Sequence, residues 1–399
     1  MALNQTPASE RVHIGIFGKR NAGKSSLINA MTGQNLAIVA DVPGTTTDPV
    51  FKTMELLPIG PVMMIDTPGI DDEGELGALR VKKSYQVLNK TDIALLVVDG
   101  VELTQAEEDL LVQIKAREIP YVIAFNKADK YPDFVPQMEH AISVSAAEGI
   151  NIWELKELIA AHYKEDESKT KLIQDLISPG DQVVLVVPID KAAPKGRLIL
   201  PQQQTIRDIL DGDAVSVVVK ETQLEETLAR MAKPPKLVVT DSQAFAFVSK
   251  VVPQAVPLTS FSILMARYKG VLEQAVSGVQ ALKRLKDGEK VLISEGCTHH
   301  RQCDDIGTVK LPRWIREFTG KELEFCFSSG TEFPEDLTEY AFVLHCGGCM
   351  LNDREMQYRM RTAKHLGVPM SNYGITIAYM QGILQRSVAM LPEIPPMED

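Results

Sequence analysis

The 399-residue sequence predicts an α/β protein with three successive domains, at residues 1–168, 178–262 and 263–399. Three observations support this fold class. A strand, a glycine-rich loop and a helix follow one another near the start of the chain. A segment rich in short apolar runs occupies the middle, and two strand-like runs near the end each lead into cysteine and histidine residues. A chain of this length usually divides into two or three domains.

Composition places the chain among globular proteins and limits its partners. Hydrophobic residues make up 45% of the sequence, well above the range of disordered chains. The formal net charge of -11 gives no whole-chain support for binding nucleic acid, so we expect no nucleic-acid partner. No apolar run approaches the length of a membrane span, and the first residues lack the pattern of a signal peptide. We therefore expect a cytoplasmic protein that does not contact a membrane.

The first domain begins with a strand over residues 12–17, which runs into GKRNAGKS at residues 18–25. This is a full match to the phosphate-binding pattern G-x-x-x-x-G-K-[ST], with the helix that the pattern needs behind it. Lys24 is expected to neutralise the β- and γ-phosphates of a nucleotide, and Ser25 to coordinate Mg²⁺. The glycines let backbone N–H groups face the phosphates. The expected nucleotide contacts of this loop are Gly18, Asn21, Ala22, Gly23, Lys24, Ser25 and Ser26.

Further motifs, each after a predicted strand, indicate that the nucleotide is GTP. In DTPG at residues 66–69, Asp66 is expected to hold Mg²⁺ through water, and the N–H of Gly69 to reach the γ-phosphate. In NKAD at residues 126–129, the Asp129 carboxylate can accept from two adjacent N–H groups of guanine, a pair of donors that adenine lacks. The other expected contacts are Asn126, Lys127, Ser145 and Ala146, the last two in a loop whose backbone N–H reads guanine O6.

Residues 43–48 occupy the position of a switch loop that closes on Mg²⁺ when the γ-phosphate is present. We expect Thr46, with Thr45 as its alternative, to contact the ion. Ile70 stands where other GTPases place a glutamine that orients water. The domain resembles the translation-factor-related GTPases of tRNA modification and ribosome assembly, and this resemblance implies a potassium ion held partly by Asn21. That residue could instead cap the loop. Slow turnover stimulated by potassium is the expected behaviour.

The middle segment, residues 178–262, has no cysteine, no histidine and no phosphate loop. Apolar runs at 183–187, 197–200, 214–219 and 237–239 predict a strand-rich unit, with a short helix over 206–210. We assign it no chemistry. An apolar edge strand can pair with its own copy, so a scaffold or dimerisation role is expected, with a monomeric spacer as the alternative.

The third domain is expected to open with a helix over residues 268–285, stopped by Gly288. Strands are predicted over 291–294, 323–327 and 340–344, and a helix over 354–366. The first strand leads toward Cys297, and the third leads into HCGGC at residues 345–349. In open α/β sheets ligands bind beyond the carboxyl ends of the strands, so both groups of residues are expected there. The N-terminus of the helix that follows should favour thiolates.

Three kinds of chemistry fit Cys297, Cys346 and Cys349. They are a structural zinc site completed by histidine, a dithiol redox pair of the last two cysteines, and an iron–sulfur cluster with one exchangeable iron. Cys326 lies within a predicted strand, where a cysteine usually serves as a small apolar residue. Cys303 is a nearby thiol without an assigned role.

The motifs CTH at residues 297–299 and HCGGC at 345–349, behind a GTPase-like domain, resemble the FeFe-hydrogenase maturation GTPases of the HydF family over essentially the whole chain. The resemblance implies a homodimer in which the three cysteines bind a 4Fe-4S cluster. It also implies a transient two-iron precursor, received from radical-SAM maturases and passed to apo FeFe-hydrogenase, with GTP binding and hydrolysis switching partner interactions. Candidates for the fourth ligand, or for residues that support the ligands, are His299, His345 and Asp304.

Two other functions fit the residues. One is an RNA- or ribosome-directed GTPase with a C-terminal zinc site. The acidic composition, and the lack of a basic stripe interleaved with aromatic residues, count against it. The other is a GTP-regulated iron–sulfur scaffold that acts outside hydrogenase maturation.

Overall fold

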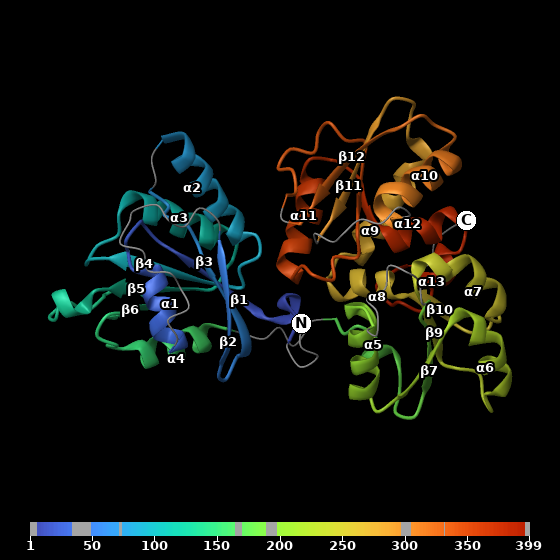
Figure 1. The fold of residues 1–399 in the computed structure, drawn as a ribbon, viewed down its shortest axis with the longest axis horizontal. Helices are drawn as coiled ribbons and strands as arrows, with labels where there is room; N and C mark the ends of the chain where they lie inside the picture. Colours follow the sequence, from blue (N-terminus) through green and yellow to red (C-terminus); the bar gives the residue numbers. More distant parts are fainter. Residues whose placement is uncertain are drawn as a thin grey trace. The chain divides into compact units, whose positions relative to one another are not determined.

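The computed structural model describes residues 6–33, 49–71, 74–163, 170–188, 198–296, 305–330 and 332–395, without the side chains of 74–76. Contacts divide the chain into two compact units, Met1–Glu167 and Ser168–Asp399 (Figure 1). No helix within the described ranges is long and apolar enough to cross a bilayer. Several residues singled out from the sequence lie outside these ranges, namely Thr45, Thr46, Cys297, His299, Cys303 and Asp304.

The first unit is built on a six-stranded sheet with the order β2-β3-β1-β4-β5-β6. Strand β2 runs antiparallel to β3, and the other neighbours are parallel. The strands are β1 (Val12–Phe17), β2 (Val50–Leu56), β3 (Gly60–Asp66), β4 (Ile93–Asp99), β5 (Tyr121–Asn126) and β6 (Ala141–Ser143).

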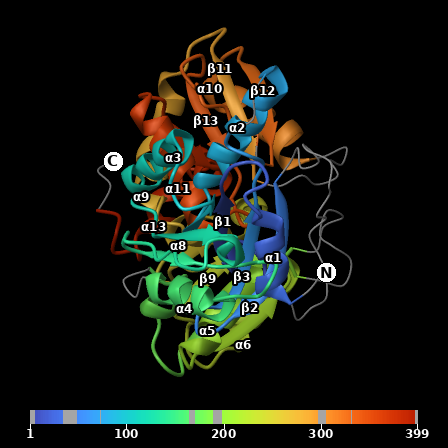
Figure 2. The ribbon, with the colours of Figure 1, turned by 90° about the vertical axis from the view of Figure 1, so that its left-hand side faces the viewer.

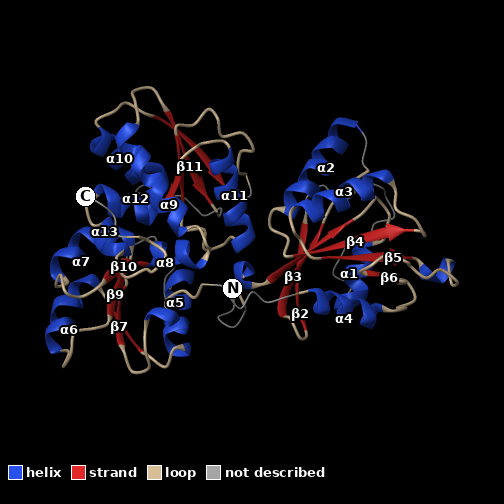
Figure 3. Ribbon diagram, turned by 180° about the vertical axis from the view of Figure 1, so that it is seen from behind, coloured by secondary structure: helices blue, strands red, loops and turns tan. Residues whose placement is uncertain are grey.

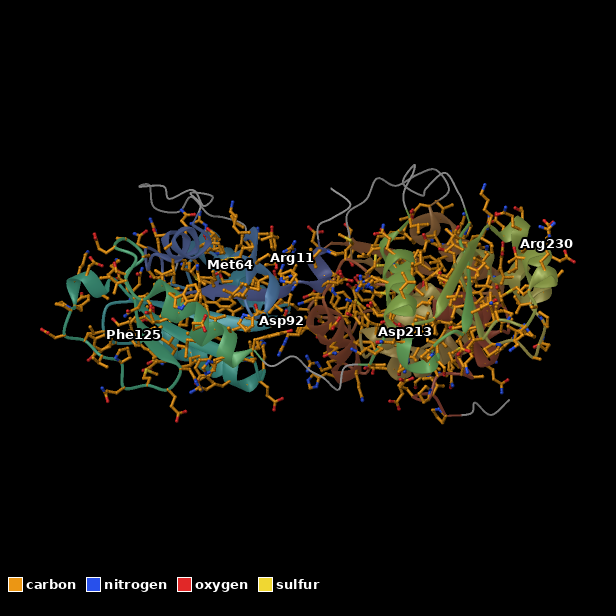
Figure 4. The ribbon with its side chains drawn as sticks, turned by 90° about the horizontal axis from the view of Figure 1, so that it is seen from below. Arg11, Met64, Asp92, Phe125, Asp213 and Arg230 are labelled. Carbon is orange, nitrogen blue, oxygen red and sulfur yellow. The ribbon has the colours of Figure 1, made fainter. Side chains whose placement is uncertain are left out.

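Helices cover both faces of this sheet. Helices α1 (Lys24–Thr32) and α4 (Ile152–His162) pack on one face, and α2 (Gly74–Leu88) and α3 (Gln105–Ala116) pack on the other (Figures 1 and 2). Met64 of β3 belongs to the first layer of core residues and Phe125 of β5 to the second (Figure 4). Because both faces are buried, the central strands are continuous apolar runs, which made them predictable.

The second unit contains two sheets of four parallel strands each, with helices packed around them (Figure 3). The first has the order β10-β9-β7-β8, and the second has the order β12-β11-β13-β14. The strands are β7 (Gln182–Val186), β8 (Val215–Val219), β9 (Leu237–Thr240), β10 (Leu258–Ser260), β11 (Lys290–Glu295), β12 (Glu324–Ser329), β13 (Phe342–His345) and β14 (Met370–Asn372).

These two sheets are copies of one fold. In each, the strand that comes second along the chain lies at one edge beside the first, and the third and fourth strands follow on the other side of the first. The sequence VPLTSFSILMARYKG at 256–270 parallels VPMSNYGITIAYMQG at 368–382. Both segments form a strand, an eight-residue helix and a turn. Both end at a glycine of nearly equal φ, which is 68° for Gly270 and 69° for Gly382. We call residues 182–278 the first copy and 290–388 the second copy.

The copies pack against each other through their equivalent helices, α8 (Phe261–Tyr268) and α12 (Tyr373–Met380). Ser262 and Gly374 hold equivalent positions and touch, since a Cβ added at Gly374 would lie 2.4 Å from the Ser262 Cβ. The Asn372 side-chain amide also donates to the Ser262 carbonyl at 3.0 Å. A single hydrophobic core runs through both copies, so together they form one folded body.

The remaining helices complete the layers. They are α5 (Leu200–Asp211), α6 (Leu224–Arg230), α7 (Phe245–Val251) and α9 (Leu272–Gly278) in the first copy, and α10 (Leu311–Thr319), α11 (Asp353–His365) and α13 (Leu384–Val388) in the second. A 3₁₀ segment (Val279–Arg284) follows α9, and a π-helical turn (Ile306–Lys310) precedes α10.

Two predictions about these elements are wrong. The single helix expected over 268–285 is interrupted, because Gly270 adopts a left-handed conformation between α8 and α9. The apolar run at 197–200 is not a strand where it is described. Leu200 instead begins α5, and Pro201 sits at its first turn, where the fixed φ of proline suits a helix. The domain boundary between residues 262 and 263 stays a prediction, and both residues belong to α8.

Candidate nucleotide-binding and metal-binding sites

The phosphate-binding loop joins β1 to α1 and leaves no room for side chains at two positions. Gly18 has a φ of 148°, and a Cβ there would lie 2.2 Å from the carbonyl oxygen of Val97. Gly23 has a φ of 92°, and a Cβ there would lie 2.2 Å from the Asn126 side-chain nitrogen. Only glycine fits such close approaches with positive φ, so the loop can bring its backbone N–H groups up to a ligand.

Lys24, Ser25 and Asp66 meet at this loop. The Lys24 ammonium donates to the carbonyl oxygens of Gly18 at 2.9 Å and Lys19 at 2.7 Å. The Ser25 hydroxyl donates to the Asp66 carboxylate at 2.6 Å. Burial raises the pKa of Asp66, while the Ser25 hydrogen bond and the Lys24 charge act in the opposite direction. A hydroxyl and a carboxylate thus face each other beside a cation, and both are oxygen ligands of the kind that Mg²⁺ prefers.

The segment after β3 closes against the same loop. A Cβ added at Gly69 would lie 2.9 Å from the Arg20 nitrogen, and the Ile70 N–H donates to the Gly18 carbonyl at 3.4 Å. The Arg20 N–H donates to the Asp71 carboxylate at 2.7 Å. Asn21, the residue expected to hold potassium, lies exposed in the loop with a φ of 60°.

Asn126 ties the phosphate-binding loop to the loop expected to read guanine. Its side-chain amide donates to the Ala22 carbonyl at 2.9 Å and accepts from the Ala146 N–H at 3.1 Å. The Ser145 hydroxyl donates to the Asp129 carboxylate at 2.6 Å. Three stretches far apart in the sequence therefore meet at one edge of the sheet.

Lys127 forms an ion pair with Asp99, at 2.6 Å, that the sequence motifs did not indicate. Asp99 ends β4, the strand next to β5, and a charged residue at the end of a buried apolar strand is the signal that would have identified it.

The second site lies at the carboxyl ends of β11 and β13. These strands are parallel neighbours, with Ser294 opposite His345. Cys346 follows β13 directly, and its sulfur accepts hydrogen bonds from the N–H of Gly296 at 3.1 Å and the N–H of Gly348 at 3.4 Å. Gly296 precedes Cys297, so the chain that leads to this third cysteine contacts Cys346. The described residues by themselves contain no group of three metal-binding side chains.

Two glycines shape the turn around these thiols. Gly348 has a φ of 64°, and a Cβ there would lie 2.5 Å from the Met356 sulfur on α11. A Cβ at Gly296 would lie 2.8 Å from Leu351 Cγ. The chain therefore folds tightly enough to place Cys346 and Cys349 in one turn, with the strand end before Cys297 against it.

The surrounding protein opposes ionisation of the thiols. The pKa of Cys349 is raised to about 11, chiefly by burial and then by the neighbouring Cys346, while the Lys269 ammonium acts in the opposite direction. Burial also raises the pKa of Cys346, against the hydrogen bonds from Gly296 and Gly348. Backbone N–H groups near the start of α11 lower the pKa of Cys349, as expected of a helix N-terminus, but burial has the larger effect. Thiols of raised pKa suit metal ligands, which ionise when a cation binds, better than a redox pair.

His345 is fully buried, and both of its ring nitrogens have partners inside the protein. Nδ1 lies 2.8 Å from the Cys346 carbonyl oxygen, and Nε2 lies 3.0 Å from Arg359 Nη1. A guanidinium can only donate, so Nε2 is the acceptor and Nδ1 carries the hydrogen that bonds the carbonyl. The pKa of His345 is lowered to about 3, chiefly by burial and then by the charge of Arg359. The neutral ring therefore braces the cysteine turn.

Comparison with protein families decides which kind of protein carries these two sites. Residues 172–270 match the hydrogen maturase F dimerization domain, and residues 273–390 match the hydrogen maturase F tetramerization domain. Residues 13–127 match a model described as a 50S ribosome-binding GTPase. The chain belongs to the hydrogen maturase F (HydF) family. Its P-loop GTPase domain is thus followed by the dimerization and tetramerization domains of that family, which correspond to the first and second copies.

Curated relatives resemble only part of this HydF family member. The tRNA modification GTPase MnmE of Heliobacterium modesticaldum is 39% identical over 155 residues, 36% of this chain and 32% of that protein. The GTPase Der of Campylobacter concisus is 33% identical over 179 residues, 40% of this chain and 38% of that protein. The chain thus spans about a third of the length of these relatives. Among solved structures, Aquifex aeolicus Era bound to GDP and AlF4⁻ aligns with a TM-score of 0.34 at 20% identity, covering 52% of this chain and 92% of that one.

Sequence reasoning missed four buried residues around the cysteines of this HydF protein, which are Glu295, Tyr373, Arg359 and Lys269. The Tyr373 hydroxyl donates to the Glu295 carboxylate at 3.2 Å. Arg359 also donates to the Glu355 carboxylate at 2.9 Å and the Gly330 carbonyl at 2.8 Å. Glu295 had a signal, since it is a charged residue at the end of an apolar strand. Tyr373 and Arg359 come from helices and Lys269 from the turn after α8, and their contact with the site follows only from the fold.

Proposed function

We propose that this HydF-family protein is a GTPase and an iron–sulfur scaffold that takes part in the maturation of FeFe-hydrogenase. The observation that carries the proposal is the contact between the Gly296 N–H and the Cys346 sulfur, which brings the approach to Cys297 against the Cys346–Cys349 turn. It stands in a chain whose second unit matches two hydrogen maturase F domains and whose first unit holds a complete phosphate-binding loop.

In this proposal the first unit binds GTP with Mg²⁺ and hydrolyses it slowly. Lys24 faces the phosphates, Ser25 and Asp66 serve the metal ion, and Asp129 selects guanine. Ile70 has no polar group that could assist catalysis, so a potassium ion beside Asn21 supplies the positive charge that hydrolysis needs. The expected test is a comparison of GTP hydrolysis in potassium and sodium buffers. Potassium should accelerate the wild-type protein, and Asn21→Ala should remove the difference between the two ions.

The second site fits a 4Fe-4S cluster held by Cys297, Cys346 and Cys349. The donor set is suitable because two thiols share one turn, and backbone N–H groups point at one of the sulfurs, as is common around such clusters. When bound, the cluster supplies an iron with one exchangeable position. His345 supports the turn, because both its nitrogens have partners, so His299 and Asp304 remain the candidates for the fourth ligand.

The cargo of this scaffold is a two-iron precursor, received from radical-SAM maturases and passed to apo FeFe-hydrogenase. GTP acts on the affinity for these partners, because switch loops present different surfaces with GTP and GDP. Lys24→Ala should therefore abolish GTP hydrolysis while the cluster still assembles. Loss of the cluster in that variant would mean that nucleotide and cluster are coupled more directly.

We expect the protein to form oligomers, because its second unit matches a dimerization and a tetramerization domain, and a homodimer through the first copy is the simplest form. Strand β8 lies at the edge of its sheet with Val215 47% exposed and Val218 44% exposed. An apolar edge strand readily adds a strand from another chain. Val218→Lys should shift the protein toward monomer in light scattering, whereas Val112→Lys, at an exposed valine of α3, should not.

The deciding experiment is activation of apo-hydrogenase by anaerobically prepared protein. Wild-type protein that has met the radical-SAM maturases should activate it, and Cys346→Ser should not. Cys326→Ser is the matched control, because this partly buried thiol of β12 lies outside the proposed ligand set. Failure of a cluster-loaded wild-type protein to activate hydrogenase would contradict the proposal.

A ribosome-directed GTPase with a zinc site is the second candidate, and the description of the model matched by residues 13–127 favours it. The net charge of -11 and the two hydrogen maturase F domains speak against it. Co-sedimentation with 50S subunits in the presence of a non-hydrolysable GTP analogue, together with one zinc per chain, would support this candidate.

A further inference from the structure

The turn that ends α8 carries two buried cations, Arg267 and Lys269. Both side chains are only 1% exposed. Burying a charged group is costly unless it is paired, and two such groups within three residues of one turn call for an explanation. Each of them reaches a different part of the second unit.

Lys269 reaches the cysteine turn. Its ammonium donates to the Leu351 carbonyl oxygen at 2.8 Å and pairs with the Asp353 carboxylate at 3.0 Å. Leu351 is two residues beyond Cys349, and Asp353 begins α11. Lys269 therefore contacts the segment that directly follows Cys349.

Comparison of the two copies shows that this charge is specific to the cysteine-bearing side. Gln381 holds the position of Lys269 in the second copy, in the same turn and before the equivalent Gly382. The N–H of Lys269 bonds the Met265 carbonyl at 2.9 Å, and the N–H of Gln381 bonds the Ile377 carbonyl at 3.1 Å. The backbone is therefore the same at both places, and the fold itself does not require a cation there.

Arg267 anchors the same turn to the start of the second unit. It forms a bidentate pair with the Asp175 carboxylate at 2.8 and 2.6 Å, and donates to the Lys171 carbonyl oxygen at 2.9 Å. It also donates to Glu393 near the end of the chain at 2.9 Å. Tyr379 stands at the equivalent position of the second copy, so this anchor too belongs to the first copy alone.

We propose that Lys269 is a positioning residue of the cluster site. Its ammonium offsets the negative charge of the Asp353 carboxylate beside the cysteine turn, so that the bound cluster is easier to reduce than it would be without Lys269. Arg267 holds the turn that carries Lys269. This inference rests on the proposed iron–sulfur function. The physical reason is that reduction adds negative charge, which a nearby cation stabilises strongly where water is excluded. Net charge and hydrogen bonding around a cluster are known determinants of its reduction potential.

The test is a redox titration of the anaerobically reconstituted full-length protein, followed by the EPR signal of the reduced cluster. Lys269→Met should shift the midpoint potential to a more negative value, because it removes the charge and keeps most of the side-chain volume. Lys269→Arg should restore a potential close to that of the wild type. Lys364→Met removes an exposed lysine from α11 and serves as the control, with no expected shift.

An unchanged midpoint in Lys269→Met, with the cluster intact, would overturn the inference. A folded Lys269→Met protein that holds no iron, beside a Lys269→Arg protein that does, would support it in a stronger form. If both variants lose iron while folded, Lys269 acts through its contacts and not through its charge, and the inference fails. A wild-type protein without any iron–sulfur cluster would instead contradict the proposed function, so the two failures are distinguishable.

The role of Arg267 is tested by hydrogen exchange of the same protein. Asp175→Asn weakens its bidentate pair and should speed amide exchange in peptides covering residues 261–272 and 346–353. Glu226→Gln, which removes the partner of Arg230 in an exposed pair of α6, is the control. Faster exchange confined to residues 170–176 would show that the anchor does not reach the cysteine turn.

Discussion

The two copies of the second unit share a backbone plan and differ in what stands at the ends of their strands. In the first copy the Asp241 N–H bonds the Val186 carbonyl at 3.4 Å, and in the second the Cys346 N–H bonds the Ser294 carbonyl at 2.9 Å. Asp241 and Cys346 therefore hold equivalent places, one residue beyond the third strand of each sheet. The same fold can carry different sites, and here only the second copy has thiols at the ends of its strands.

The largest effect should come from the residues that distinguish the copies. Cys346→Ser with Cys349→Ser removes two of the three proposed sulfur ligands, so iron content after anaerobic reconstitution should fall to background. Asp241→Asn changes the equivalent position of the first copy and should leave iron content unchanged. Loss of iron in the Asp241 variant would show that the first copy takes part in the site and would break the comparison.

A smaller effect, on the free energy of unfolding, is expected when a buried arginine of the second copy and an exposed arginine of the first copy are replaced. Arg359→Met in the second copy leaves Glu355 and the Gly330 carbonyl without their buried partner, which should lower the free energy of unfolding by about 3–5 kcal/mol. Arg230→Met in the first copy breaks an exposed pair with Glu226 and should change it by no more than about 0.5 kcal/mol. Urea unfolding of the metal-free proteins measures both, and equal losses would refute this account of Arg359.

The smallest effect concerns what the copies share. Gly270 and Gly382 end equivalent helices with φ of 68° and 69°. A residue other than glycine in a left-handed conformation costs about 1–2 kcal/mol, so Gly270→Ala and Gly382→Ala should destabilise the protein by similar amounts. The loss at Gly270 should be slightly the larger, because an added Cβ would lie 3.2 Å from the Gln357 side chain. Thermal unfolding of both variants measures the two losses. A loss of stability in only one of the variants would show that the two glycine positions are not equivalent.

The parts of the fold that could be predicted are those in which a sequence pattern is compatible with only one local structure. The loop that contains Gly18, Gly23 and Lys24 was predictable because strand, glycines and lysine occur at fixed spacing. The apolar runs of β4, β5 and β7 were predictable because strands buried on both faces must be apolar throughout. Strands β10 and β14 were missed, since three residues carry too little pattern to recognise.

The interruption at Gly270 was missed for a different reason. Apolar residues continue at helical spacing from α8 through α9 into the 3₁₀ segment, so periodicity indicated one helix, and the turn at the glycine decided otherwise. The same holds at the cysteine site. His345, Cys346 and Cys349 are contiguous and were found, whereas Lys269 and Arg359 come from other elements and reach the site only through packing.

We propose above all that the second copy binds an iron–sulfur cluster through Cys297, Cys346 and Cys349. Elemental analysis of the protein after oxygen-free purification and reconstitution tests it most directly. We predict iron and sulfide in the amounts of one 4Fe-4S cluster per chain, with little zinc. One equivalent of tightly bound zinc per chain, with iron at background level, would contradict it.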